Sequence, residues 1–152
     1  MRGSLEHLIV RRGIWEDLGN DVPLKEGESK TGKSLCLTYC SRELVPEAKL
    51  HMSYSWVLEV PFPNPGIQEH VHDYDEVLFF MGSDRENPGE LHGELDLYLE
   101  GEPYRIRETA FVCIPAGVRH CPLDYLRVDR PHQFISLSLT PAYASRGTGS
   151  AS

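Results

Sequence analysis

The segment Gln68-Glu69-His70-Val71-His72-Asp73-Tyr74-Asp75-Glu76 brings two imidazoles and a carboxylate into metal-ligand spacing. Side chains at positions i and i+2 of an extended segment leave the same face, so His70 and His72 can point at one spot. If residues 73–75 bend the chain, the carboxylate of Glu76 reaches the same spot as a third donor. Two histidines and one carboxylate form a ligand set for non-haem iron, manganese and zinc. The segment therefore predicts a divalent-metal site beside a strand.

A fourth donor follows further along the chain. Pro115-Ala116-Gly117-Val118-Arg119-His120 is a proline- and glycine-bearing turn that runs straight into a histidine. Such a tight turn is expected where an imidazole must swing back into a site. An isolated histidine pair or an isolated turn of this kind is often only structural. All four donors in order, surrounded by apolar strands, favour a metal site instead.

Apolar residues alternate with polar ones in several segments, which is the period-two pattern of strands with one buried face. In one segment Met52, Tyr54, Trp56, Leu58 and Val60 form the apolar set, and we expect this set to face the core. Similar alternation covers residues 95–99, 104–107 and 135–139, while residues 77–81 and 111–114 are continuous apolar runs typical of fully buried strands. Short strands separated by Pro/Gly turns, without a long helical pattern, predict an all-β sandwich or barrel.

Two segments resemble the signatures of the cupin superfamily. Residues 66–82 (GIQEHVHDYDEVLFFMG) resemble the first signature, and residues 111–124 (FVCIPAGVRHCPLD) resemble the second. Residues 89–102 are similar to a group of small, single-domain bacterial cupins. The resemblance implies an all-β fold, a single antiparallel double-stranded β-helix (jelly-roll) barrel. Its implied ligands for one metal ion are His70, His72, Glu76 and His120.

Length and composition indicate one globular domain. The chain has 152 residues, of which 40% are hydrophobic, enough for a full core. We expect a barrel over residues 35–140. Residues 1–34 form an N-terminal extension that packs on the barrel or on a partner subunit, and residues 141–152 form a mobile tail.

Charge and hydropathy exclude several classes of partner. The formal net charge is −8, and the densest basic stretch, Arg127 to Arg130, is interrupted by an aspartate. Nucleic acid is therefore not an expected partner. The sequence contains neither an apolar run of membrane-spanning length nor a signal peptide, so we expect no membrane contact and a cytoplasmic location.

The remaining histidines and the cysteines are expected to be structural. His7, His51, His92 and His132 lack partners at ligand spacing and are interpreted as solvated or hydrogen-bonded. The spacings of the four cysteines match neither a zinc pair nor a dense disulfide framework, which indicates reduced thiols. Cys121 adjoins His120 but faces the opposite way in an extended segment, so it is a poor fifth ligand.

Two functional hypotheses from different classes remain open. The favoured one is a metal-dependent enzyme for a small oxygenated organic substrate, either an oxygenase of dioxygenase type or a lyase or isomerase with the metal as Lewis acid. Its cofactor would be one divalent ion per chain, of iron, manganese, zinc or nickel. The alternative is a non-catalytic module that binds a metal or a small ligand.

The sequence also offers candidates for substrate contacts and for the quaternary structure. Gln68 has the same strand parity as His70 and His72 and is the best polar pocket residue, with Tyr54, Trp56 and Phe80 as further pocket candidates. No catalytic residue beyond the metal ligands is identified. An apolar patch in the N-terminal extension, together with the resemblance to cupins, predicts a homodimer in which the extension packs on the neighbouring barrel.

Overall fold

The computed structural model describes residues 4–17, 22–23, 35–143 and 146–147. Across these residues the chain is nearly all β, and the only helix is the single 3-10 turn η1 (Glu6–Leu8). The strands are β1 (Ile14–Asp17), β2 (Val22–Pro23), β3 (Leu35–Cys40), β4 (His51–Val57), β5 (His70–Val71), β6 (Glu76–Gly82), β7 (Glu90–Leu99), β8 (Glu102–Glu108), β9 (Ala110–Ile114), β10 (His120–Val128), β11 (His132–Ser138) and β12 (Arg146–Gly147).

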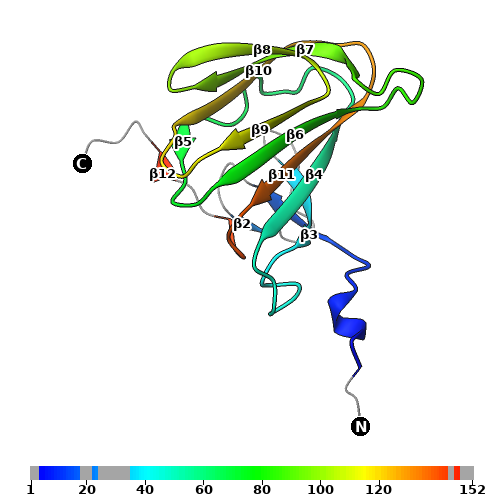
Figure 1. Cartoon of the computed structure of the whole chain (residues 1–152), viewed down its shortest axis with the longest axis vertical. Coiled ribbons are helices and arrows are strands. Elements are labelled where there is room, and N and C mark those ends of the chain that lie inside the picture. Colours follow the sequence, from blue (N-terminus) through cyan, green and yellow to red (C-terminus); the bar gives the residue numbers. More distant parts are fainter. Residues whose placement is uncertain (1–3, 18–21, 24–34, 144–145, 148–152) are drawn as a thin grey trace.

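The strands form two antiparallel sheets that face each other (Figure 1). One sheet has the order β2-β1-β3-β4-β11-β6-β9, and the other has the order β12-β5-β10-β7-β8. Neighbours in each sheet are mostly distant in sequence, as in a jelly roll, where the chain crosses repeatedly between two sheets. The predicted all-β antiparallel barrel is confirmed.

The hydrophobic core lies between the two sheets. Phe80 on β6 packs its ring against Phe134 on β11, with ring centroids 5.2 Å apart. Leu95 and Leu97 on β7 cover this pair from the opposite sheet, and all of these side chains are buried. In the segment 95–99 the leucines thus face the core, as the alternation predicted. This apolar region occupies one part of the barrel and leaves the other part to polar residues.

The buried face of strand β4 is the one that the sequence pattern predicted to be exposed to solvent. His51 and Ser53 are buried, each about 1% exposed, while Tyr54 is half-buried and Trp56 is 50% exposed. Leu58 and Val60, just beyond the strand, are exposed as well, so the expectation that Met52, Tyr54, Trp56, Leu58 and Val60 face the core is wrong. The period of two was correct, but the buried face is the polar one.

Strand β11 shows the same inversion beside β4. Ser136 and Ser138 are buried, whereas Ile135 and Leu137 are only half-buried. Ser53 pairs with Ser136 and His51 pairs with Ser138, so the polar side chains form one continuous inner surface across the two strands. Similarly, the runs at residues 77–81 and 111–114 are not fully buried, since alternate residues face outward. The interior at this end of the barrel is polar because it surrounds the candidate site described below.

Parts of the two terminal segments belong to the sheets. Strand β1 pairs with β3 of the same chain, and β12 pairs with β5. The other residues assigned to the mobile tail, 144–145 and 148–152, and residues 1–3, 18–21 and 24–34 of the extension lie outside the described residues. No helix in the described part of the chain has the length and apolar character needed to cross a membrane.

Candidate metal centre

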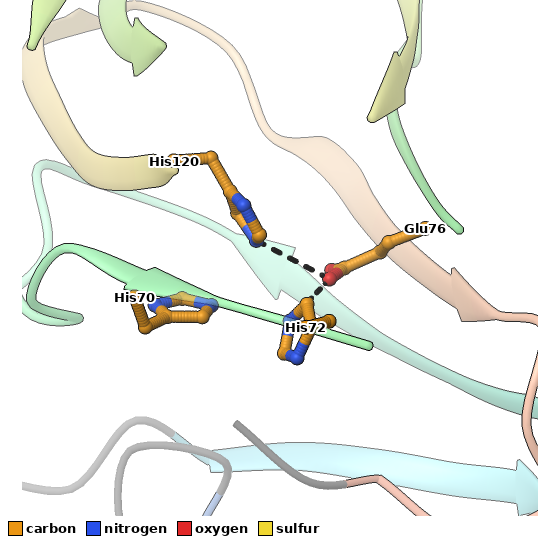
Figure 2. A group of neighbouring side chains, drawn as sticks. All are labelled: His70, His72, Glu76 and His120. Carbon is orange, nitrogen blue, oxygen red and sulfur yellow. Dashed lines mark ion pairs between the residues drawn. The ribbon is translucent and has the colours of Figure 1, made fainter. Parts of the chain in front are cut away.

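The four donor residues predicted from the sequence come together at one end of the barrel. His70 lies on β5 and His120 begins β10, and these two residues are direct partners in the five-stranded sheet. Glu76 begins β6 in the facing sheet, and His72 lies in the short link between β5 and β6. The group is therefore held from both sheets, and Figure 2 shows Glu76 pointing toward His72 and His120.

The donor atoms of the four residues are close enough to share one ion. One ligand atom from each residue lies within 4.8 Å of every other, and all four residues are buried. Nε2 of His72 is 2.6 Å from Oε2 of Glu76, and Nε2 of His120 is 3.4 Å from the same oxygen. Three imidazoles and one carboxylate that converge in this way make up a donor set for a divalent transition metal.

Backbone carbonyls orient two of the imidazoles. Nδ1 of His70 lies 2.7 Å from the carbonyl oxygen of Gln68, and Nδ1 of His120 lies 2.9 Å from that of Val118. When Nδ1 carries the proton and donates it to the carbonyl, Nε2 keeps its lone pair for a metal. In both residues the hydrogen-bond partner is the carbonyl two positions earlier, so the local backbone sets the tautomer.

The electrostatics of the group favour an ionised Glu76 carboxylate beside a neutral His70 imidazole. Burial alone would raise the pKa of Glu76, but neighbouring His120 and His72 outweigh it and lower that pKa to about 2. Burial lowers the pKa of His70 to about 4. The His120 imidazole is also opposed by burial, yet Glu76 and the Val118 carbonyl raise its pKa above the usual value. At neutral pH Glu76 is thus ionised and His70 is neutral, the protonation states that metal binding needs.

Two buried polar atoms of the group lack the partners that a bound cation would supply. Oε2 of Glu76 and Nε2 of His120 are buried and form no hydrogen bond among the described residues. An ionised carboxylate that is 4% exposed is costly unless a cation or donors compensate it. An ion at the point where the donor atoms converge would satisfy both atoms, so the residues present fit a bound metal.

Ser136 is a part of the site that the sequence analysis missed. Its hydroxyl donates a hydrogen bond to Oε1 of Glu76 at 3.1 Å, which leaves Oε2 for the histidines. Ser136 faces the interior of β11, directly beside β6. The only signal for it in the sequence was a polar position in an apolar alternation, and that pattern was interpreted as the solvent face.

The turn before His120 is tied to the segment that carries the other ligands. The amide of Gly117 donates to the carbonyl of His72 at 2.9 Å, and the amide of Ala116 donates to Oδ1 of Asp75 at 2.9 Å. Gly117 has a φ of +86°, a conformation that favours glycine. The two signature segments are therefore joined by hydrogen bonds, which explains why a turn of this composition precedes the histidine.

The residues predicted to line a substrate pocket are spread over different environments. Gln68 is exposed, and its carbonyl supports His70. Phe80 is in the core, and Tyr54 is half-buried on the outer face of the sheet. Trp56 contributes to a cavity of about 370 Å³ near the end of β4, whose lining also includes Ser55, Phe62, Asn64, Tyr125 and Phe134. None of the four donor residues lines this cavity.

The other histidines are hydrogen-bonded, as expected. His7 pairs with Glu47, His92 with Asp84, His132 with Tyr125, and His51 with Glu16. The four cysteines are free thiols, also as expected. Burial raises the pKa of the Cys121 thiol far above its usual value, so this group stays protonated and is a poor ligand.

Comparison with known proteins identifies the fold. No protein-family model matches the sequence, and no curated protein does so. Among solved structures, oxalate decarboxylase from Bacillus subtilis is similar, with a TM-score of 0.52 and 14% identity over 82% of this chain. The match covers 30% of that enzyme, so this chain spans less than a third of its length. A second structure of the same enzyme, described as having Mn(II) centres, has a TM-score of 0.50 at 12% identity, with the same coverage.

A cupin protein from Bacteroides fragilis matches 85% of this chain and 93% of its own, at 12% identity and a TM-score of 0.44. The two antiparallel sheets and the similarity to oxalate decarboxylase show that this chain has the cupin fold. At these identities the likeness concerns the fold alone. The four-residue group could hold a metal ion, and this conclusion rests on the geometry of this chain.

Proposed function

We propose that this protein is a metal-dependent enzyme that acts on a small oxygenated organic substrate. The observation that carries the proposal is the buried set of four donor residues whose ligand atoms lie within 4.8 Å of one another. Two of its imidazoles are oriented by backbone carbonyls, and its carboxylate is oriented by a serine hydroxyl. Such supporting contacts around a ligand set are typical of metal centres.

The donor set suits iron, manganese, zinc or nickel, one ion per chain. Manganese gains some support from the similar fold of oxalate decarboxylase, whose structure is described with Mn(II) centres. A divalent ion held by these residues would supply either Lewis acidity or the activation of dioxygen. The protein residues would hold the ion, exclude bulk water from it and keep Glu76 ionised. The reaction is accordingly of oxygenase type or is a lyase or isomerase reaction.

The proposal is tested by metal analysis of protein purified without a histidine tag. We expect about one divalent ion per chain, lost on chelation and regained on addition of Mn(II), Fe(II) or Zn(II). Oxygen consumption with a panel of diketones, thiols and phenols then separates an oxygenase from a Lewis-acid enzyme, since only the oxygenase needs dioxygen. Binding of panel compounds without turnover under any metal would favour the non-catalytic binding module.

Two further properties belong to this proposal. We propose that the protein forms a homodimer, because the outer face of its seven-stranded sheet exposes large apolar side chains such as Trp56 and Phe111. We also propose a cytoplasmic location, which is supported by the free thiols of its four cysteines. Fractionation of cells that express the protein would test the location.

A further inference from the structure

A second group of buried polar residues adjoins the candidate metal centre. The inner surface of β4 and β11 carries His51, Ser53 and Ser138, each at most 1% exposed. His51 is the direct partner of Ser138, and Ser138 is the direct partner of Glu76 on β6. Neighbouring strands are about 4.8 Å apart, so His51 lies roughly 10 Å from the backbone of Glu76 across this sheet. We refer to His51, Ser53 and Ser138 as the polar wall. One of its residues, Ser138, is thus the cross-strand neighbour of the candidate metal ligand Glu76.

Three polar atoms of this wall have no partner within the described part of the chain. They are Nδ1 of His51, Oγ of Ser53 and Oγ of Ser138. Most buried polar atoms in proteins are hydrogen-bonded, and a buried polar group without a partner destabilises the folded state. Apolar residues or alanine at these positions would avoid this cost. The side chains are thus better suited to bind a polar molecule than to stabilise the fold.

His51 is held in one orientation by a carboxylate. Its Nε2 atom lies 3.2 Å from Oε1 of Glu16, which reaches the interior from β1. Burial would raise the pKa of Glu16, but His51 and Thr38 outweigh it and lower that pKa. An ionised Glu16 accepts a hydrogen bond from Nε2 of His51, and in the tautomer that carries its proton on Nε2, the Nδ1 atom is a hydrogen-bond acceptor.

One aromatic ring connects the polar wall with the candidate metal centre. The Tyr143 ring is 5.8 Å from the His51 ring and 5.1 Å from the His72 ring, centroid to centroid. His51 and His72 therefore flank the same side chain. The two groups also adjoin directly, because Ser138 of the wall is the cross-strand neighbour of Glu76, so a molecule with a chain of a few carbon atoms could reach both.

The chemistry of the wall selects for uncharged polar groups. Its partners are two hydroxyls, which donate or accept, and one imidazole nitrogen, which accepts. The buried polar residues of the described chain include no lysine or arginine, and the charged groups beside the wall are two carboxylates, Glu16 next to His51 and Glu76 next to Ser138. A carboxylate or phosphate placed here would lack a counter-charge. Hydroxyl groups would find both donors and acceptors.

We propose that His51, Ser53 and Ser138 form a subsite for the hydroxyl groups of an uncharged, polyhydroxylated substrate. The proposal rests on the proposed function only in assigning the other end of the substrate to the metal. The hydroxyl subsite itself belongs to this chain with or without an ion. Glu16 acts as a positioning residue, because it orients His51 without reaching the substrate.

Binding of two four-carbon probes tests the proposed class. Erythritol carries four hydroxyls and no charge, whereas succinate carries two carboxylates. Saturation-transfer NMR on the metal-free and on the Zn(II)-loaded protein should show erythritol binding in both states. Ser53→Ala and Ser138→Ala should each weaken this binding about threefold to tenfold, the effect of one lost hydrogen bond. The Leu126→Ala variant, altered at an exposed site on β10, should bind like the wild type.

Thermal stability separates binding from a structural role, and Ser136 provides a matched control on the same face of the same strand. The Ser138 hydroxyl is unpaired, while the Ser136 hydroxyl is bonded to Glu76. In the metal-free protein, Ser138→Ala should leave Tm unchanged or raise it by a few degrees, whereas Ser136→Ala should lower it. A Ser138→Ala variant that loses stability as Ser136→Ala does would show that the hydroxyl is structural, and would overturn the proposal.

These experiments distinguish a failure of the proposed hydroxyl subsite from a failure of the proposed metal-dependent function. Absence of erythritol binding, binding unaffected by the two serine substitutions, or succinate binding to metal-free protein as tightly as erythritol would each overturn the subsite. Failure of the protein to bind any divalent metal would overturn the proposed function and would leave erythritol binding to the metal-free protein as expected.

Discussion

The hydroxyl of Ser136 donates a hydrogen bond to Oε1 of Glu76 at 3.1 Å, from β11 to the adjacent strand β6. Both side chains are buried on the inner face of the seven-stranded sheet. Because Oε1 is engaged by the hydroxyl, Oε2 is directed toward His72 and His120. A residue without any metal-ligand character thus determines which oxygen of the carboxylate is offered to an ion.

Ser136→Ala should weaken metal binding without removing any ligand. Loss of the hydroxyl frees Glu76 to rotate, and loss of a contact that supports a ligand typically lowers metal affinity about tenfold to a hundredfold. Competition with a fluorescent chelator measures the change in Kd. Ser138→Ala is the control, since its hydroxyl makes no hydrogen bond among the described residues. Equal affinity of wild type and Ser136→Ala would show that the hydrogen bond does not support a ligand.

His70→Ala and His72→Ala should each reduce the metal content to near zero. Each substitution removes one nitrogen donor from a buried group, and the described residues offer no spare donor to replace it. Elemental analysis of the purified variants provides the measurement. His92→Ala should retain its metal, because His92 is bonded to Asp84 outside the group. A loss of metal in this control as large as in the other two variants would mean that the wrong histidines were assigned.

Glu76→Gln should weaken metal binding about tenfold to a hundredfold or more, because an amide keeps the shape of the side chain but not its charge. Its matched control is Asp73→Asn, which removes one negative charge from an exposed position in the same segment. Calorimetric titration with Mn(II) or Zn(II) gives both affinities. The assignment of Glu76 as a ligand would be abandoned if Asp73→Asn had the larger effect.

The stability of the protein should fall between pH 7 and pH 5 because of His132. Burial lowers the pKa of this histidine from 6.5 to about 4. Between these two values the unfolded chain binds a proton that the folded chain cannot accept, so the free energy of unfolding decreases as pH falls. A shift of this size corresponds to about 2 kcal/mol at pH 5.

His132→Phe should remove this contribution and keep an aromatic ring beside Tyr125, which stacks on His132 with ring centroids 5.7 Å apart. Urea unfolding of wild type and variant at both pH values, without metal, measures the difference. Burial also lowers the pKa of His70, but that contribution is common to both proteins and cancels. Parallel pH profiles for the two proteins would contradict the prediction.

The protein should sediment and scatter light as a dimer, with twice the 17.2 kDa of one chain. Trp15, Trp56 and Phe111 are 41%, 50% and 61% exposed on strands of one sheet, and a partner subunit would bury them. Trp56→Glu should produce monomers, because a charge in an apolar interface is not compensated. Leu126→Glu, at a comparably exposed leucine of the other sheet, should remain dimeric. A monomeric wild-type protein at micromolar concentration would refute the prediction.

The sequence determined the class of fold and the donor set of the site. Turn residues such as those at 115–117 and the period-two patterns indicated short antiparallel strands, and these signals are local. The spacing of His70 and His72 and the position of Glu76 at the start of a strand are equally local. Because these features depend on neighbouring residues only, they could be predicted before the structure, and the structure brings His120 to the same group.

Only the tertiary structure decided which face of each strand lies inside. Alternation of Ser53 with Tyr54 gives the same period whichever residue is buried, and hydrophobicity alone favoured the tyrosine. The opposite is observed because β4 and β11 line a polar compartment next to the donor set, and this compartment exists only once two sheets enclose it. Ser136 on Glu76 and Glu16 on His51 join residues that are 60 and 35 positions apart. Such long-range partners follow from strand order and register, which no local pattern in the sequence specifies.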